Sequence, residues 1–107
     1  MCLYEVNFQV SNSILAYYRQ WLTTHAQEMV KFDGFMGAEI FLVTDPEPNL
    51  GMTGLCVQYF LTDQASLDRY LVLHAPRMRA EGKKLFGDNF KAERRVLLRE
   101  QKIDRDS

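Results

Sequence analysis

The chain has 107 residues, of which 47% are hydrophobic and 25% are charged, and its formal net charge is −1. This mixture is typical of one globular domain and excludes wholesale disorder, while the length leaves hardly enough residues for two separate cores. The acidic balance and the absence of a nucleic-acid-binding signature make nucleic acid an unexpected partner.

The start of the chain shows no basic region followed by an apolar run, so the sequence predicts no secretory signal. Its most apolar stretch, residues 55–61, is far too short to span a bilayer. Cys2 and Cys56 have neither the number nor the spacing of a zinc site or a disulfide framework, and we expect both to be reduced thiols. These features predict a cytoplasmic protein that does not enter a membrane.

The first half of the chain predicts a strand, a helix and a turn. Apolar and polar residues alternate over residues 3–10, which indicates a strand with two different faces. Residues 11–13 (Ser-Asn-Ser) carry the short side chains that cap helix N-termini, and a helical period follows over residues 14–32. Gly34 suits a left-handed C-cap. The inward stripe predicted for this helix contains Ile14, Tyr18, Trp21, His25, Met29 and Phe32.

The second half predicts two strands, a broken helix and a last strand. Residues 35–43 and 55–61 read as strands, joined by a loop whose prolines and glycine exclude regular pairing. Asp63 is the expected N-cap of a helix that runs towards Leu85, and Pro76 predicts a kink or restart within it. The final strand is expected at residues 90–99.

The predicted order of strand, helix, strand, strand, helix, strand is an α+β ferredoxin-like βαββαβ fold. We expect a four-stranded antiparallel sheet in the order 4-1-3-2, with the helices on one face. Residues 1–99 would form this single domain, and residues 100–107 a mobile charged tail. The other sheet face is mixed in character, which favours a homodimer formed through it. Its predicted members are Leu3, Glu5, Asn7, Gln9, Glu39, Phe41, Gln58, Phe60, Arg95 and Leu97.

Several short segments resemble an uncharacterised bacterial family, a domain of unknown function. They are residues 74–79 (His-Ala-Pro-Arg-Met-Arg), 86–88 (Phe-Gly-Asp) and 94–97 (Arg-Arg-Val-Leu), supported by Tyr4-Glu5-Val6-Asn7, Gly34-Phe35 and residues 55–59. The family is similar in turn to the dimeric α/β-barrel superfamily, whose subunits join sheet to sheet. That superfamily includes antibiotic-biosynthesis monooxygenases, haem-degrading monooxygenases, lactone isomerases and proteins that only bind ligands. The resemblance therefore implies a fold and a dimer more than an activity.

Haem-degrading members of the superfamily carry an asparagine on the first strand and a histidine on the second helix. Asn7 and His74 occupy those places here. The functional tryptophan of those members is missing from its place, because Trp21 lies on the first helix. Haem is therefore not expected, and we predict no cofactor.

Two histidines provide the main candidate site. His25 follows Trp21 by one helical turn, and His74 follows Tyr70 by one turn, so each lies on a predicted inward stripe. If both helices pack on one sheet face, the imidazoles could share a pocket with aromatic hydroxyls such as that of Tyr59, suited to proton transfer. Alternatively, each is a core histidine bonded to a neighbour. The stripes offer no carboxylates, so no metal site is expected.

The charges are unevenly distributed. Residues 76–99 carry eight basic and three acidic groups, whereas residues 1–75 carry three basic and eight acidic groups. This asymmetry indicates either complementary charges within or between subunits, or a basic lip that includes Arg77 and attracts an anionic ligand. Arg94 shares a row with apolar residues, so it is expected either to pair with Glu5 or Glu39 or to act as an anion clamp.

Three functions remain open from the sequence, because no phosphate loop, nucleophile elbow or metal motif is present. The first is a homodimer that binds a small aromatic or anionic ligand. The second is a cofactor-independent monooxygenase or isomerase for a small aromatic or quinone-like substrate, with His74, His25 and Asn7 as candidate catalytic residues. The third is a structural or interaction module without a ligand.

Overall fold

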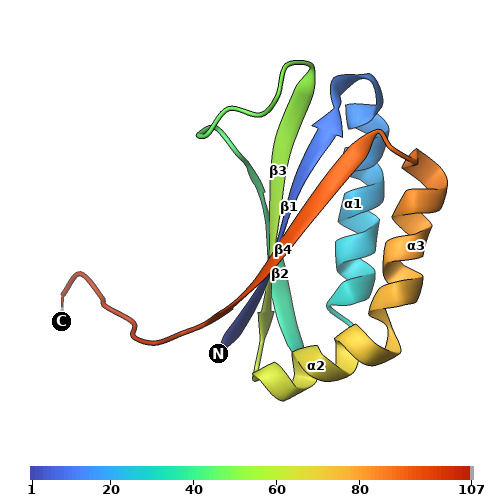
Figure 1. The fold of residues 1–107 in the computed structure, drawn as a ribbon. Coiled ribbons are helices and arrows are strands. Elements are labelled where there is room, and N and C mark those ends of the chain that lie inside the picture. Colours follow the sequence, from blue (N-terminus) through green and yellow to red (C-terminus); the bar gives the residue numbers. More distant parts are fainter. Residues whose placement is uncertain (107) are drawn as a thin grey trace.

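A computed structural model describes residues 1–106, and it contains one four-stranded antiparallel sheet covered by helices on one side (Figure 1). The strands follow the order β2-β3-β1-β4 across the sheet. This is the predicted ferredoxin-like arrangement, which is confirmed. The strands are β1 (Cys2–Ser11), β2 (Phe35–Leu42), β3 (Met52–Leu61) and β4 (Phe90–Leu98).

The helical layer consists of a single 3₁₀ turn (Asn12–Ile14) and three helices, α1 (Leu15–Met29), α2 (Gln64–Leu73) and α3 (Ala75–Phe86). In Figure 1, α1 and α3 run side by side along the sheet, and α2 lies at its lower end. The predicted cap at Asp63 is confirmed, since its Oδ1 accepts a hydrogen bond from the Ser66 backbone N–H at 2.8 Å. The predicted break at Pro76 is also confirmed, because a second helix restarts there with proline in its first turn.

The predicted cap at residues 11–13 is wrong. Neither the 3₁₀ turn nor α1 has a side-chain cap. The Ser11 hydroxyl donates instead to Met52 Sδ at 3.6 Å, and Asn12 Oδ1 accepts from the Thr53 hydroxyl at 2.6 Å. These side chains bond to the start of β3 because β1 continues to Ser11 and pairs with β3 up to that point.

The inward stripe of α1 differs from the predicted one. Its buried residues are Tyr18, Leu22, Ala26 and Met29, whereas Trp21 and His25 are half-buried. The reason is that α1 packs against two neighbours. Leu22 and Ala26 join the sheet-facing core, while Trp21 lies against α3 at Gly82, where an added Cβ would come within 2.9 Å of the indole ring. Trp21 and His25 therefore lie at the edge of the helix–sheet interface.

Within residues 1–106, no helix covers the sheet face turned away from α1 and α3 (Figure 1), and we call this face the open face. Its three central rows follow from the strand register, which pairs β4, β1, β3 and β2 in turn. The apolar row contains Leu97, Leu3, Phe60 and Gly37; the charged row contains Arg95, Glu5, Gln58 and Glu39; the third row contains Glu93, Asn7, Cys56 and Phe41. This pattern confirms the mixed face expected from the sequence.

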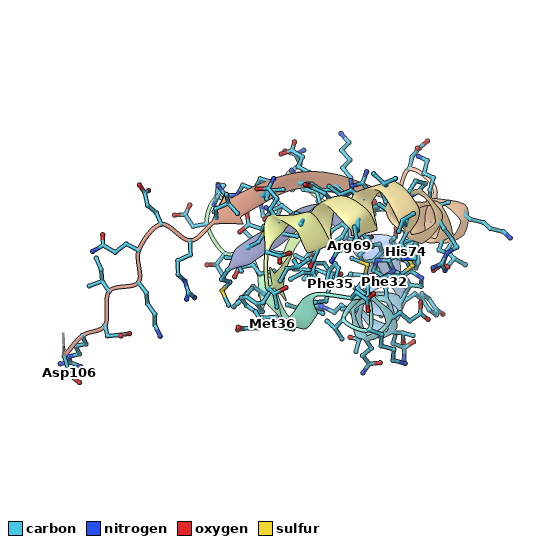
Figure 2. All side chains as sticks on the ribbon, turned by 90° about the horizontal axis from the view of Figure 1, so that it is seen from below. Phe32, Phe35, Met36, Arg69, His74 and Asp106 are labelled. Carbon is cyan, nitrogen blue, oxygen red and sulfur yellow. The ribbon has the colours of Figure 1, made fainter. Side chains whose placement is uncertain are left out.

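None of the helices within residues 1–106 combines the length and apolar character needed to cross a membrane. Beyond Leu98 the described chain contains no strand or helix, and residues 99–106 are exposed. Figures 1 and 2 show this tail leading away from the body, with Asp106 far from the helices. Ser107, the last residue of the predicted tail, lies outside the described residues.

Deleting residues 100–107 is expected to change the melting temperature by about 2 °C or less, because residues 100–106 are exposed and bury almost no apolar surface. Differential scanning calorimetry of the shortened and full-length chains at equal protomer concentration checks this. A loss of several degrees would mean that the tail docks on another subunit.

Candidate functional site

A cavity of about 50 Å³ lies between the sheet and the helices α1 and α3. That volume holds a few water molecules or a group of similar size. Aromatic and apolar side chains form most of its wall, and every lining residue comes from β1, α1, β3, α2, α3 or β4. The lining residues are Tyr4, Val6, Phe8, Tyr18, Trp21, His25, Met29, Tyr59, Tyr70, Met78, Arg79, Gly82, Phe90 and Arg94.

Two buried polar atoms of this lining have no hydrogen-bond partner within residues 1–106: the Tyr18 hydroxyl oxygen and His25 Nδ1. The Tyr18 ring is held by Phe86 and Phe90, at centroid distances of 5.0 and 5.3 Å. The His25 imidazole stacks on Trp21 at 4.5 Å with an interplanar angle of 23°. Ring packing therefore fixes both side chains, while their polar atoms stay free to bond to an occupant.

Burial lowers the pKa of His25 below its ordinary value; the nearby Glu28 carboxylate opposes this effect and Arg94 adds to it. A histidine with a lowered pKa is uncharged at neutral pH, so it can accept a proton there. Burial raises the pKa of the Tyr18 hydroxyl well above its usual range. The cavity therefore presents a neutral imidazole and a protonated phenol.

Three further tyrosines, Tyr4, Tyr59 and Tyr70, line the same cavity and pack together. Tyr4 stacks on Tyr59 at 5.9 Å and lies 6.1 Å from Tyr70, measured between ring centroids. The Tyr4 hydroxyl accepts a hydrogen bond from Arg79 Nη2 at 3.0 Å, which ties α3 to the sheet. Burial raises the pKa of both Tyr59 and Tyr70, so these phenols also remain protonated near neutrality.

The formal charges at the cavity are positive. Arg94 lies opposite Val6 in the β1–β4 register and so shares the helix-facing side of the sheet. Across residues 1–106, no hydrogen bond or ion pair engages its guanidinium, and Arg79 supplies a second cation. No lining residue is a carboxylate. Both arginines are exposed, so they place positive charge at the solvent side of the cavity, and this charge favours an anionic occupant.

The structure brings together five of the predicted site residues in this cavity: Trp21, His25, Tyr59, Tyr70 and Arg94. Sequence reasoning missed Arg79 and did not single out Tyr18. The position of Tyr18 on the predicted stripe was visible, but its lack of a partner depends on the packing of α3 and β4.

His74 does not share the cavity of His25. It lies at the junction of α2 and α3 and lines a separate hollow of about 70 Å³, which Tyr70 also lines. Its imidazole stacks on Phe32 at 4.2 Å with an interplanar angle of 18°. Figure 2 shows Phe32 close to His74 and to Arg69 of α2. The imidazoles of His25 and His74 therefore line different cavities.

Two further predicted site residues lie outside the cavity. Arg77 is exposed and lies 3.7 Å from Glu81, one turn further along α3. Asn7 lies on the open face, where its side-chain amide donates to Glu5 at 3.0 Å.

The alternative in which Arg94 pairs with Glu5 or Glu39 is wrong, because no ion pair engages Arg94 within residues 1–106 and Arg95 pairs with Glu5. Arg95 Nε donates to Glu5 Oε2 at 2.5 Å. Adjacent strand residues point to opposite faces, so Arg95 shares the open face with Glu5 while Arg94 faces the helices. No group of three or more histidine, cysteine, aspartate or glutamate residues in the described part of the chain could hold a metal ion.

Solved structures with the same fold are similar over nearly the whole chain. A Deinococcus radiodurans protein assigned as an antibiotic biosynthesis monooxygenase is 16% identical, with a TM-score of 0.73 and 97% of each chain covered. SnoaB from Streptomyces nogalater, described as a cofactor-independent oxygenase, is 14% identical in a mutant form, with a TM-score of 0.66 and 95% of this chain and 96% of SnoaB covered. A dimeric ferredoxin-like protein from an uncultured marine organism is 11% identical, with a TM-score of 0.65 and coverages of 95% and 97%. These similarities establish the fold.

No curated protein matches the sequence. A family model described as "domain of unknown function (DUF4286)" matches residues 1–100, so nearly all of the described fold, including the whole cavity, falls within the match. The chain therefore belongs to the DUF4286 family.

Proposed function

We propose that the protein is a homodimer that binds a small ligand in the cavity between α1, α3 and the sheet. The observation that carries this proposal is the pair of unpartnered buried polar atoms, the Tyr18 hydroxyl and His25 Nδ1, which line one cavity. Leaving a buried polar group unbonded costs about 1–3 kcal/mol. A ligand that bonds to both atoms recovers that free energy, whereas apolar side chains at these positions would avoid the cost altogether.

The chemistry of the wall indicates the kind of ligand. Tyr18 and His25 require a polar group, the rings around them favour an aromatic body, and the unpaired Arg94 favours negative charge. In this conformation a volume of about 50 Å³ accepts one polar group or a diatomic molecule rather than a whole ring. A ring would require Trp21 to move away from Gly82, its close neighbour on α3.

A second candidate function is a cofactor-independent monooxygenase or isomerase acting on a small aromatic or quinone-like substrate. A neutral imidazole in an aromatic cavity favours it, because His25 can accept a proton from a phenol or enol while Arg94 and Arg79 stabilise the resulting anion. The similarity to SnoaB supports this candidate at the level of the fold only.

The dimer is supported by the open face, which exposes apolar side chains among polar ones and carries no helix (Figure 1). A chain of this length buries a modest fraction of its surface, so covering that face stabilises it. The similarity to a protein described as dimeric and ferredoxin-like agrees with this arrangement.

Tyr18→Phe tests the ligand site. The unliganded variant is expected to melt at the same temperature as the wild type or up to about 5 °C higher, because a buried unsatisfied hydroxyl is removed. It should also lose most of the thermal shift that any small aromatic acid or quinone induces in the wild type. The measurement is a thermal-shift screen, repeated with His25→Gln and with oxygen uptake for every compound that binds.

Tyr17→Phe is the matched control, since it removes the same atom from a neighbouring tyrosine that is 73% exposed. It should bind like the wild type. If no compound shifts the wild type and Tyr18→Phe is destabilised, the hydroxyl is structural and an interaction module without a ligand becomes the better description. Oxygen uptake with a bound compound would favour the oxygenase over simple binding.

A further inference from the structure

We infer that two open faces stack about a twofold axis running parallel to the strands, so that Arg95 on β4 of each subunit pairs with Glu39 on β2 of the other. This inference rests on the homodimer proposed above and adds its geometry and the residues that each copy contributes. The strand register and the charges on the open face that lack partners both point to this pairing.

The charged row crosses the sheet from edge to edge. Arg95 on edge strand β4 lies opposite Glu5, Glu5 lies opposite Gln58, and Gln58 lies opposite Glu39 on the other edge strand. The row therefore has a cation at one edge, an anion at the other and a buried carboxylate near its middle.

Within one subunit, only the carboxylate in the middle of this row has a full set of hydrogen-bond partners. Glu5 is 5% exposed and accepts hydrogen bonds from Arg95, Gln58 and Asn7. Arg95 uses only Nε for this bond, and its side chain is 66% exposed, so both terminal nitrogens remain available. Glu39 is exposed, and no ion pair engages it within residues 1–106.

The twofold symmetry of a homodimer allows two ways of stacking such faces in line. An axis parallel to the strands places β4 over β2 of the second copy, and each Arg95 then meets a Glu39. An axis across the strands and centred on this row places β4 over β4, so Arg95 meets Arg95 and Glu39 meets Glu39. Like charges brought together at an interface cost several kcal/mol, which favours the first arrangement.

The neighbouring rows lead to the same choice. With the axis parallel to the strands, each row faces its own copy, so Leu97 lies over Gly37 and Leu3 over Phe60. With the axis across the strands and centred on the charged row, the apolar row would face the third row, so Leu3 would cover Asn7 and Leu97 would cover Glu93. Glu93 meets an apolar side chain about either axis, because the axis parallel to the strands places it over Phe41. The charged and apolar rows are therefore better matched about the axis parallel to the strands.

Charge reversal with mixing tests the pairing. Glu39→Arg places Arg95 against a second cation twice in each dimer and is expected to weaken the dimer roughly 100-fold or more. Arg95→Glu should weaken it in the same way. An equimolar mixture of the two variants should form a heterodimer close to wild-type affinity, because both ionic contacts are then between opposite charges. Analytical ultracentrifugation over a concentration series, with one variant fluorescently labelled, measures this.

Glu93→Arg is the matched control, since it makes the same charge change one row away on the open face and should weaken the dimer only a few-fold. Because Arg95→Glu also faces Glu5, circular dichroism checks its fold, and Arg95→Gln replaces it in the mixture if it unfolds.

A Glu39→Arg dimer as tight as the wild type would overturn the inference and leave the proposed dimer standing. A wild-type chain that sediments as a monomer at micromolar concentration would overturn both. Preferential pairing of Arg95→Glu with the wild type would indicate the axis across the strands, because that axis brings position 95 of one subunit against position 95 of the other.

Discussion

Arg95→Met is expected to lower the melting temperature by several degrees. Its side chain supplies the charged partner of Glu5, whose carboxylate is 5% exposed and would otherwise remain ionised with only two neutral amide donors. Removing Arg95 leaves the buried Glu5 carboxylate without a charged partner, whereas replacing both residues leaves no uncompensated buried charge. Thermal denaturation at a fixed protomer concentration measures the loss.

Two further variants test that explanation. Combining Arg95→Met with Glu5→Gln should recover most of the loss, because no buried charge is then left unpaired. Glu39→Gln leaves the Glu5 hydrogen bonds intact. It therefore measures separately how much the proposed Arg95–Glu39 pair between subunits adds to stability. Equal loss in the single and combined variants would mean that the apolar part of Arg95, rather than its charge, stabilises the sheet.

The same network predicts a pH dependence. The hydrogen bond from Arg95 holds the pKa of Glu5 below its usual range against the opposing effect of burial, and bonds from Gln58 and Asn7 add to it. A carboxyl group whose pKa is lower in the folded than in the unfolded state stabilises the fold above the unfolded pKa. That stabilisation is lost as the pH falls through the folded pKa. Between about pH 5 and pH 3, the wild type should therefore lose more stability than Glu5→Gln.

Gly34→Ala is expected to lower the free energy of unfolding by about 3 kcal/mol or more. Gly34 has a φ of +83°, which strains any residue with a Cβ, and an added Cβ would overlap both Ser66 Oγ and Ser66 Cβ. Ser66 is held by the Asp63 cap at the start of α2, so it cannot move aside without breaking that cap. Thermal and chemical denaturation measure the effect.

Gly51→Ala provides the control, because Gly51 has a similar φ of +78° but no atom within 4 Å of an added Cβ. It should cost only about 1 kcal/mol, the conformational part of the penalty. The difference between the two variants measures the close approach of the α1–β2 turn to α2. Equal losses would show that the turn relaxes away from Ser66.

Local chemistry was enough to predict the order of the elements. In β1, Tyr4 and Val6 point to one face of the sheet and Glu5 and Asn7 to the other, because successive side chains of a strand alternate between the two faces. This holds whichever strands lie next to β1. The Asp63 cap and the Pro76 restart also depend on a few neighbouring backbone groups. For the same reason the mixed open face was visible in the sequence.

Only the tertiary structure decided the contents of the site. The apolar stripe of a helix is wide, so the sequence does not determine which of its residues are buried most deeply. In α1 this was decided by simultaneous contact with the sheet and with α3, which buried Leu22 and placed Trp21 and His25 at the edge of the helix–sheet interface. The choice between Arg94 and Arg95 as partner of Glu5 depended on the register of β4 against β1, since one residue of shift exchanges the two faces. The separation of His25 from His74, and the two unpartnered atoms of the cavity, arise from packing among elements distant in the sequence, which no local pattern encodes.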